Sequence, residues 1–81
     1  MSRKNTAKQP HRLTCLIERE NGAYVSLCPE LDIASQGKTV EKARDNLIEA
    51  VELFFETASP SEVSRRLRSE VYITPIEVRV A

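Results

Sequence analysis

Two strand-like runs flank the dipeptide Asn21-Gly22, and this arrangement limits the fold more than any other feature of the sequence. Residues 13–17 are mostly apolar, and the run YVSLC at 24–28 resumes a β-forming pattern after the turn. Asn-Gly is the pair that best suits a two-residue hairpin turn, because both positions need a positive φ. The sequence therefore predicts a β-hairpin.

The two-residue turn also fixes which residues face each other across the hairpin. Counting outward from it gives three predicted pairs: Arg19 with Tyr24, Ile17 with Ser26, and Cys15 with Cys28. The two thiols are then neighbours, and either of two states is open to them. A disulfide would lie near the short end of the usual Cα separation, whereas two small reduced cysteines fit a buried core, which is the state we expect.

A third strand is predicted directly after the hairpin. Pro29 ends the second strand, Glu30 and Leu31 turn the corner, and residues 32–36 form the strand that Gly37 closes. Both faces of the hairpin carry apolar side chains: Leu13, Cys15, Ile17, Tyr24 and Cys28 on one face, and Leu16, Val25 and Leu27 on the other. One helix cannot cover both faces of such a sheet.

A long amphipathic helix follows, with Thr39 as its expected N-cap and Glu41 in its first turn. One arc of this helix is apolar: Val40, Ala43, Leu47, Ile48, Ala50, Val51, Phe54 and Phe55. The opposite arc is charged: Glu41, Lys42, Asp45, Glu49, Glu52 and Glu56. Arg44 lies at the edge of the apolar arc, where it either contacts a partner or extends its charged end into water.

A second, short helix is predicted from Ser59 to Arg68, because Ser59 to Glu62 has the form of a capping box with proline at the first helical position. Its cluster of Arg65, Arg66 and Arg68 either grips phosphates or is a solvated helix end, and the second meaning is the commoner.

Residues 70–81, EVYITPIEVRVA, predict a final strand, with Pro75 bending it or placing it at a sheet edge. Ile76, Val78 and Val80 alternate with Glu77 and Arg79, so one face of the strand is apolar. The predicted fold class is therefore α+β, with a small antiparallel sheet packed on one main helix in the order β-β-β-α-β. An exposed strand of this kind is a template for pairing with another chain.

The step Gly37-Lys38-Thr39 invites comparison with a phosphate-binding loop, which needs a glycine five residues before the second glycine. Asp32 occupies that position, and its carboxylate would repel a phosphate. We therefore interpret Gly37 as the residue that lets the chain reverse before the helix.

No catalytic constellation emerges from the sequence. His11 is the only histidine and lies in the polar N-terminal stretch, so no ordered Cys-His pair is expected. Glu18, Glu30 and Asp32 come near strand ends, where carboxylates can hold a metal for nuclease chemistry, but ordinary surface charge explains them better. We expect no enzyme, no cofactor and no metal site.

The chain has 81 residues, with 12 basic and 12 acidic side chains and a formal net charge of +0. A domain of this size buries only about 60% of its unfolded surface and has little self-repulsion, so we expect a homodimer or a higher oligomer. No apolar run is long enough for a membrane span, so a cytoplasmic protein is predicted. Residues 1–12 form a predicted disordered basic tail, the only expected contact for nucleic acid, and residues 13–81 form the domain.

The run GAYVSLCPELDIASQGKTVEKARDNLIEAVELFFE at 22–56, together with VYITPIEV at 71–78, resembles the HicB family of antitoxins. The likeness lies in the ordered combination of the tyrosine and cysteine, Pro-Glu-Leu, a glycine before threonine, and the alanines and leucines of the helix. It covers most of the chain from about Leu13 onward.

The resemblance implies a partial ribonuclease-H-like domain without a nuclease site, which binds and masks a small mRNA-cleaving toxin of the HicA type. Many family members add a C-terminal DNA-binding domain, but this sequence ends at Ala81, so we expect none here. The alternative is a stand-alone oligomeric domain that binds another protein or a nucleic acid. The residues predicted to contact a partner are Glu18, Glu30, Asp32, Arg44, Val78 and Val80.

Overall fold

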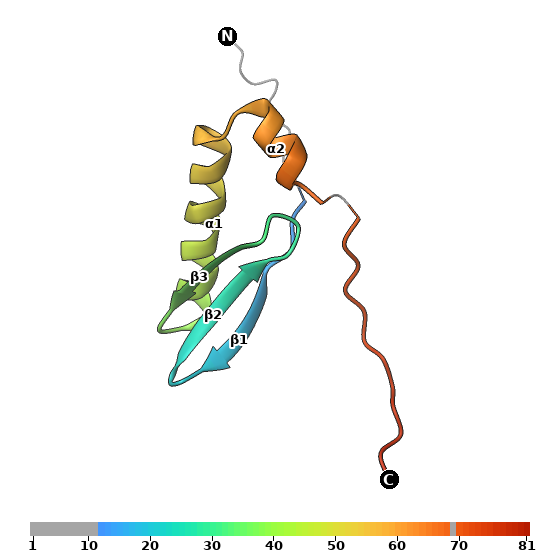
Figure 1. Cartoon of the computed structure of the whole chain (residues 1–81). Helices are drawn as coiled ribbons and strands as arrows, with labels where there is room; N and C mark the ends of the chain where they lie inside the picture. The colour runs from blue at the N-terminus through green and yellow to red at the C-terminus, as the bar shows by residue number, and fades with distance from the viewer. Residues whose placement is uncertain (1–11, 69) are drawn as a thin grey trace.

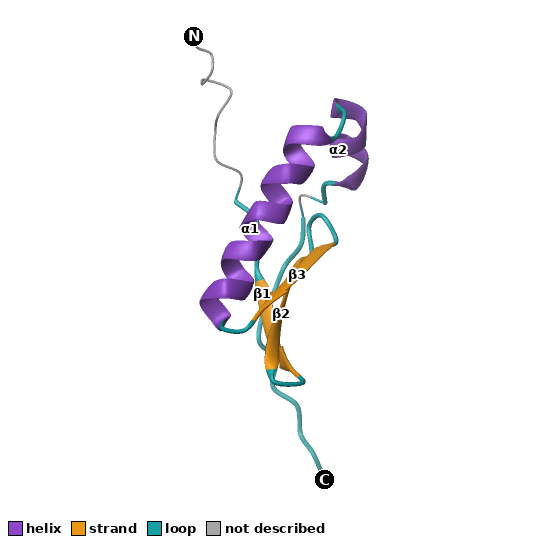
Figure 2. Ribbon diagram, turned by 90° about the vertical axis from the view of Figure 1, so that its left-hand side faces the viewer, coloured by secondary structure: helices purple, strands orange, loops and turns teal. Residues whose placement is uncertain are grey.

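The computed structural model describes residues 12–68 and 70–81. Its elements, in chain order, are β1 (Leu16–Glu20), β2 (Ala23–Cys28), β3 (Ile33–Gly37), α1 (Val40–Thr57) and α2 (Pro60–Arg66) (Figure 1). The strands form one antiparallel sheet in the order β1-β2-β3, and α1 lies along one face of it (Figure 2). The predicted α+β class is confirmed. The predicted basic tail lies outside the described residues except for Arg12, which is exposed.

The hairpin forms with the predicted turn and register. Asn21 and Gly22 have φ values of 52° and 78°, the positive values that this turn type requires. The cross-strand partners include Arg19 with Tyr24 and Ile17 with Ser26, as expected. Local turn chemistry therefore determines the alignment of these two strands.

The ladder stops one residue short of the predicted pair of Cys15 with Cys28, although both cysteines line one pocket. The ladder ends at Leu16 opposite Leu27, so Cys15 precedes β1, and both cysteines are free thiols. Beyond it, Thr14 would face Pro29, which has no backbone N–H, and the Thr14 N–H donates instead to the carboxylate of Glu30 at 3.0 Å. Cys28 is buried as expected, whereas Cys15 is exposed.

Both helices begin where their capping residues predict. The Lys42 backbone N–H donates to Thr39 Oγ1 at 3.0 Å, and the Glu62 backbone N–H donates to Ser59 Oγ at 3.2 Å. These hydroxyls satisfy backbone donors that a helix leaves without intrahelical partners. The second helix ends at Arg66, two residues before the predicted end.

The core lies between α1 and the sheet and is small. Its buried apolar members are Cys28, Leu31, Ala43 and Leu47. The arc of α1 predicted to be apolar is wider than the surface it packs on, so Val40 and Ile48 remain 44% and 40% exposed. The reason is the position of α1, which packs mainly on β3 and only marginally on β1. The other face of the sheet has no helix over it within the described chain, as the two-sided apolar pattern predicted.

Gly37 serves a different purpose from the predicted one. Its φ is not positive, but a Cβ at this position would lie 2.5 Å from the Ala43 backbone N and 2.7 Å from the Lys42 backbone C. The first turn of α1 therefore packs directly on the backbone of β3. Glycine is needed here for this close approach.

The predicted final strand does not form. Residues 70–81 are extended but have no ladder partner, and they run away from the body of the domain (Figure 1). A strand needs a neighbouring strand to satisfy its backbone donors and acceptors, and the sheet of this single chain does not supply one.

Replacing Gly37 by alanine is expected to lower the free energy of unfolding by about 1–3 kcal/mol, because the new methyl group meets rigid helix backbone. Urea denaturation followed by circular dichroism measures the change. Gln36→Ala is the matched control, since the Gln36 side chain is exposed and should cost well under that amount. Equal stability of Gly37→Ala and wild type would contradict the close packing.

Candidate protein-binding surfaces

The loop between β2 and β3 contains the most constrained polar residue of the domain. Glu30 is only 7% exposed, and its carboxylate accepts two hydrogen bonds from Thr14: from the backbone N–H at 3.0 Å and from Oγ1 at 2.6 Å. The Cys28 thiol lies 3.5 Å from the same carboxylate. Glu30 therefore ties the start of β1 to the loop. Glu30 was predicted to contact a partner, but in this chain its carboxylate is buried and already bonded.

Burial alone raises the pKa of Glu30, since it penalises the charged form. The hydrogen bonds from the Thr14 side chain and backbone act in the other direction and prevail, so the pKa of Glu30 lies below its ordinary value. Burial raises the pKa of the neighbouring Cys28 thiol, and the Glu30 charge adds to this. Cys28 is therefore held in the unreactive thiol form at neutral pH.

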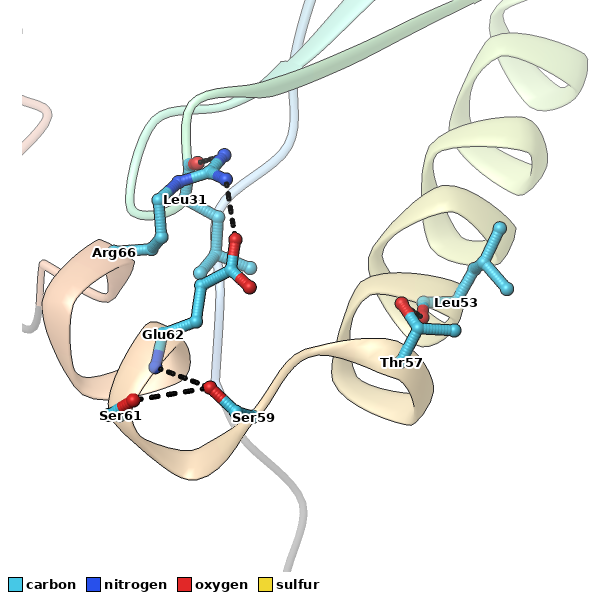
Figure 3. Close-up of polar contacts among 7 residues, drawn as sticks. All are labelled: Leu31, Leu53, Thr57, Ser59, Ser61, Glu62 and Arg66. Atoms are coloured by element: carbon cyan, nitrogen blue, oxygen red, sulfur yellow. Dashed lines mark hydrogen bonds and ion pairs between the residues drawn. The ribbon is translucent and has the colours of Figure 1, made fainter.

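The same loop receives α2, as Figure 3 shows. The Arg66 guanidinium donates from Nη2 to the Leu31 carbonyl oxygen at 2.8 Å and lies 5.1 Å from the centre of the Phe54 ring. Arg66 is neither a free phosphate-binding group nor a solvated helix end, the two predicted alternatives. It is half-buried and links α2 to the loop and to α1. Arg65 and Arg68 are exposed.

An acidic groove lies along α1, beside Ser35 of β3. Glu49, Glu52 and Glu56 follow one another at spacings of three and four residues, which places them on one face of the helix. They line an open groove of about 530 Å³ together with Leu53, which is 58% exposed, and Asn46. No ion pair within the described residues reaches these three carboxylates. The groove therefore presents negative charge beside an apolar side chain.

Asn46, which also lines the acidic groove, links α1 to β3. Its side-chain amide donates to the Gln36 carbonyl oxygen of β3 at 2.7 Å. This contact occupies a backbone acceptor of β3, so β3 is partly protected from pairing with another strand. Within the described chain β1 has no such contact, and all of its residues except Ile17 are exposed.

The open face of the sheet is a second exposed surface. Leu16, Val25, Leu27 and Ala34 lie side by side on it and, with Glu18, line a cavity of about 210 Å³. Glu18 is exposed there, as its predicted part in partner contact requires. This face is mainly apolar, so Glu18 is an isolated charge on it.

The other residues predicted to contact a partner are exposed but scattered. Asp32 lies in the loop before β3 with a φ of 58°, and Arg44 on α1 pairs with Asp45 at 3.3 Å. Val78 and Val80 belong to the extended C-terminal segment. The structure therefore does not bring the six predicted residues into one site. The acidic groove of α1 was visible in the sequence only as the charged arc of the helix.

The described residues contain no group of three or more His, Cys, Asp or Glu side chains placed to hold a metal ion. None of the helices in these residues is both long and apolar enough to cross a bilayer.

Two proteins of known sequence are similar to this chain. A UPF0150 protein of Synechocystis sp. is 44% identical over 54 residues, which cover 64% of this chain and 68% of the relative. A UPF0150 protein of Helicobacter pylori is 31% identical over 70 residues, which cover 85% of this chain and 97% of the relative. No family model matches the chain. No solved structure matches it either.

Glu30→Gln is expected to lower the free energy of unfolding at pH 7 by about 1–3 kcal/mol, because the Thr14 donors lose a charged acceptor. A carboxyl group whose pKa is depressed on folding stabilises the protein fully above its unfolded pKa of about 4.3, and this contribution is lost as the pH falls through the folded pKa. The difference between wild type and variant should therefore narrow below about pH 4.

Urea titrations at pH 7 and pH 3 measure this difference. Glu18→Gln is the matched control, because Glu18 is exposed and its side chain makes no hydrogen bond with the described residues, so its effect should stay within about 0.5 kcal/mol at both pH values. A Glu30→Gln effect that is the same at both pH values would contradict the assigned role of the charge.

The two thiols should differ in reactivity. We expect one thiol, Cys15, to react quickly with a thiol reagent in the folded protein, and Cys28 to react only after denaturation, because it is buried and its pKa is raised. Thiol titration of the folded and the urea-denatured protein, with Cys15→Ser for assignment, checks this. A count near zero in denaturant would instead indicate a disulfide.

Proposed function

Because this chain belongs to the UPF0150 protein family, we propose a function for the family's small domain: it is a HicB-like antitoxin that binds and masks a small basic toxin of the HicA type. The names of the two relatives state no activity, so the proposal rests on the geometry of this chain and on the resemblance of residues 22–56 and 71–78 to HicB proteins. Such a complex would act in the cytoplasm, where mRNA is cleaved.

The observation that carries the proposal is the acidic groove of α1. Its three carboxylates are exposed and without ion pairs among the described residues, although the formal net charge of the chain is +0. A local concentration of one charge in a neutral protein favours a partner of opposite charge and increases the rate of its association. A toxin that binds RNA through basic residues presents such a surface.

Leu53 adds a second kind of contact to the same groove. It is 58% exposed and lies among the carboxylates, so a bound partner can bury it while its basic groups meet Glu49, Glu52 and Glu56. An apolar side chain surrounded by charged groups is the usual composition of a binding surface with a dry centre and a polar rim.

The test uses the chain and a small basic toxin of the HicA type encoded by a neighbouring gene. Wild type should co-purify with the toxin and restore growth of cells that express it. Glu49→Lys/Glu52→Lys should raise the Kd about tenfold or more at low salt, and less at high salt, because the lost attraction is screened.

The matched control is Glu20→Lys/Glu41→Lys, which changes the net charge by the same amount at exposed positions outside the acidic groove. If both double variants weakened binding equally, the groove would not be the interface. If wild type bound no toxin at any salt concentration, the antitoxin proposal would be wrong, and the alternative of a stand-alone oligomeric domain would be favoured.

A further inference from the structure

The C-terminal segment, residues 70–81, has strand-like chemistry but no partner in its own chain. Ile76, Val78 and Val80 are 80%, 70% and 87% exposed. Among these residues the structure shows one hydrogen bond, a local one from Thr74 Oγ1 to the Pro75 carbonyl oxygen. Large apolar side chains exposed in a row are a surface that a protein normally covers.

The segment has one clear strand-forming unit. Pro75 has no backbone N–H, so a ladder that includes the segment can begin at Ile76. From there to Val80 apolar and charged residues alternate, which places Ile76, Val78 and Val80 on one face and Glu77 and Arg79 on the other.

This unit is complementary to itself. If two copies run antiparallel with Val78 opposite Val78, Ile76 of each copy faces Val80 of the other, and Glu77 faces Arg79. Apolar residues then meet apolar residues, and opposite charges meet twice. Cross-strand pairs of both kinds stabilise antiparallel sheets, whereas like charges directly opposite destabilise them.

We propose that two copies of this chain associate through residues 76–80, which pair antiparallel about a two-fold axis at Val78. The interface is isologous, because each contact between residues of the two copies occurs twice. It is independent of the toxin-binding proposal, since it uses a different segment and needs no other protein.

The fold places the segment where this pairing is possible. The Arg68 backbone N–H donates to the Glu30 carbonyl oxygen at 2.8 Å, so the segment starts from a fixed point at the loop between β2 and β3. Residues 70–75 are extended, and at about 3.3 Å each they give the unit a reach of roughly 20 Å. The segment is therefore long enough for the units of two copies to meet between their sheets.

A two-stranded ribbon alone is marginally stable in water, so its apolar face needs cover. Each body offers an uncovered apolar surface of matching kind, the open face of the sheet with Leu16, Val25, Leu27 and Ala34. Two bodies related by the two-fold axis provide two such faces for the six apolar side chains of the ribbon.

Cysteine cross-linking tests the register directly, in a Cys15→Ser background that removes the exposed native thiol. Val78→Cys places two thiols opposite each other at the axis, within the Cα separation of about 4.4–6.8 Å that a disulfide spans. Val80→Cys places them four residues apart along the ribbon, or about 14 Å. With a mild oxidant, Val78→Cys should give mostly covalent dimer and Val80→Cys little.

Charge exchange tests the same pairing without a new bond. Glu77→Arg alone and Arg79→Glu alone each place like charges opposite one another, and each should raise the dimer Kd about tenfold. The double variant Glu77→Arg/Arg79→Glu should restore the wild-type value, and a mixture of the two single variants should form a heterodimer. Sedimentation equilibrium over a range of concentrations measures these constants.

Three outcomes would overturn the proposal. The first is a protein that stays monomeric at the highest concentration measured. The C-terminal segment would then be expected to pair with the sheet of its own chain or with a different protein. The second is equal cross-linking of Val78→Cys and Val80→Cys. The third is a double charge exchange that remains as weak as the single variants.

Discussion

The buried carboxylate of Glu30 is the contact on which the rest of this small domain depends. Thr14 brings the start of β1 to it, and the backbone of the same loop receives Arg66 and Arg68 from the end of the chain's second helix. Next to it, Leu31 is only 1% exposed and fills the core against α1. One short loop therefore holds the first strand, the main helix and the second helix in a fixed relation.

Most contacts between the helices and the sheet lie at β3 and at the loop between β2 and β3, and the rest of the sheet is largely exposed. α1 packs mainly on β3, Gly37 allows the two backbones to touch, and Asn46 occupies a carbonyl group of β3. The opposite edge, at β1, and the open face have no such protection within the described residues. A domain of this size has too little core to cover both sides of its sheet, and the proposed dimer would cover the open face with a second copy.

Features set by local chemistry were predictable from the sequence. The Asn21-Gly22 turn fixes the hairpin register, and the hydroxyls of Thr39 and Ser59 fix the helix starts, because each depends on residues within a few positions. The functions of Glu30 and Leu31 were not predictable, since a turn residue shows no periodicity that reveals burial. The same limit applies to the contact between Thr14 and Glu30, which joins residues 16 positions apart.

The wrong prediction of a final strand at residues 70–81 has a different cause from the missed contacts of the β2–β3 loop. The alternation in residues 76–80 gives the segment one apolar and one charged face, but a strand exists only when another strand accepts its hydrogen bonds. Alternation specifies which side chains share a face and says nothing about whose backbone lies alongside. The charges add that information here: Glu77 and Arg79 are placed symmetrically about Val78, a symmetry that pairing with β1 would not use. The order of apolar and charged residues is complementary to the same order in reverse, so the segment suits antiparallel pairing with a second copy of itself. The segment therefore does not need the free edge of the sheet at β1 as its partner.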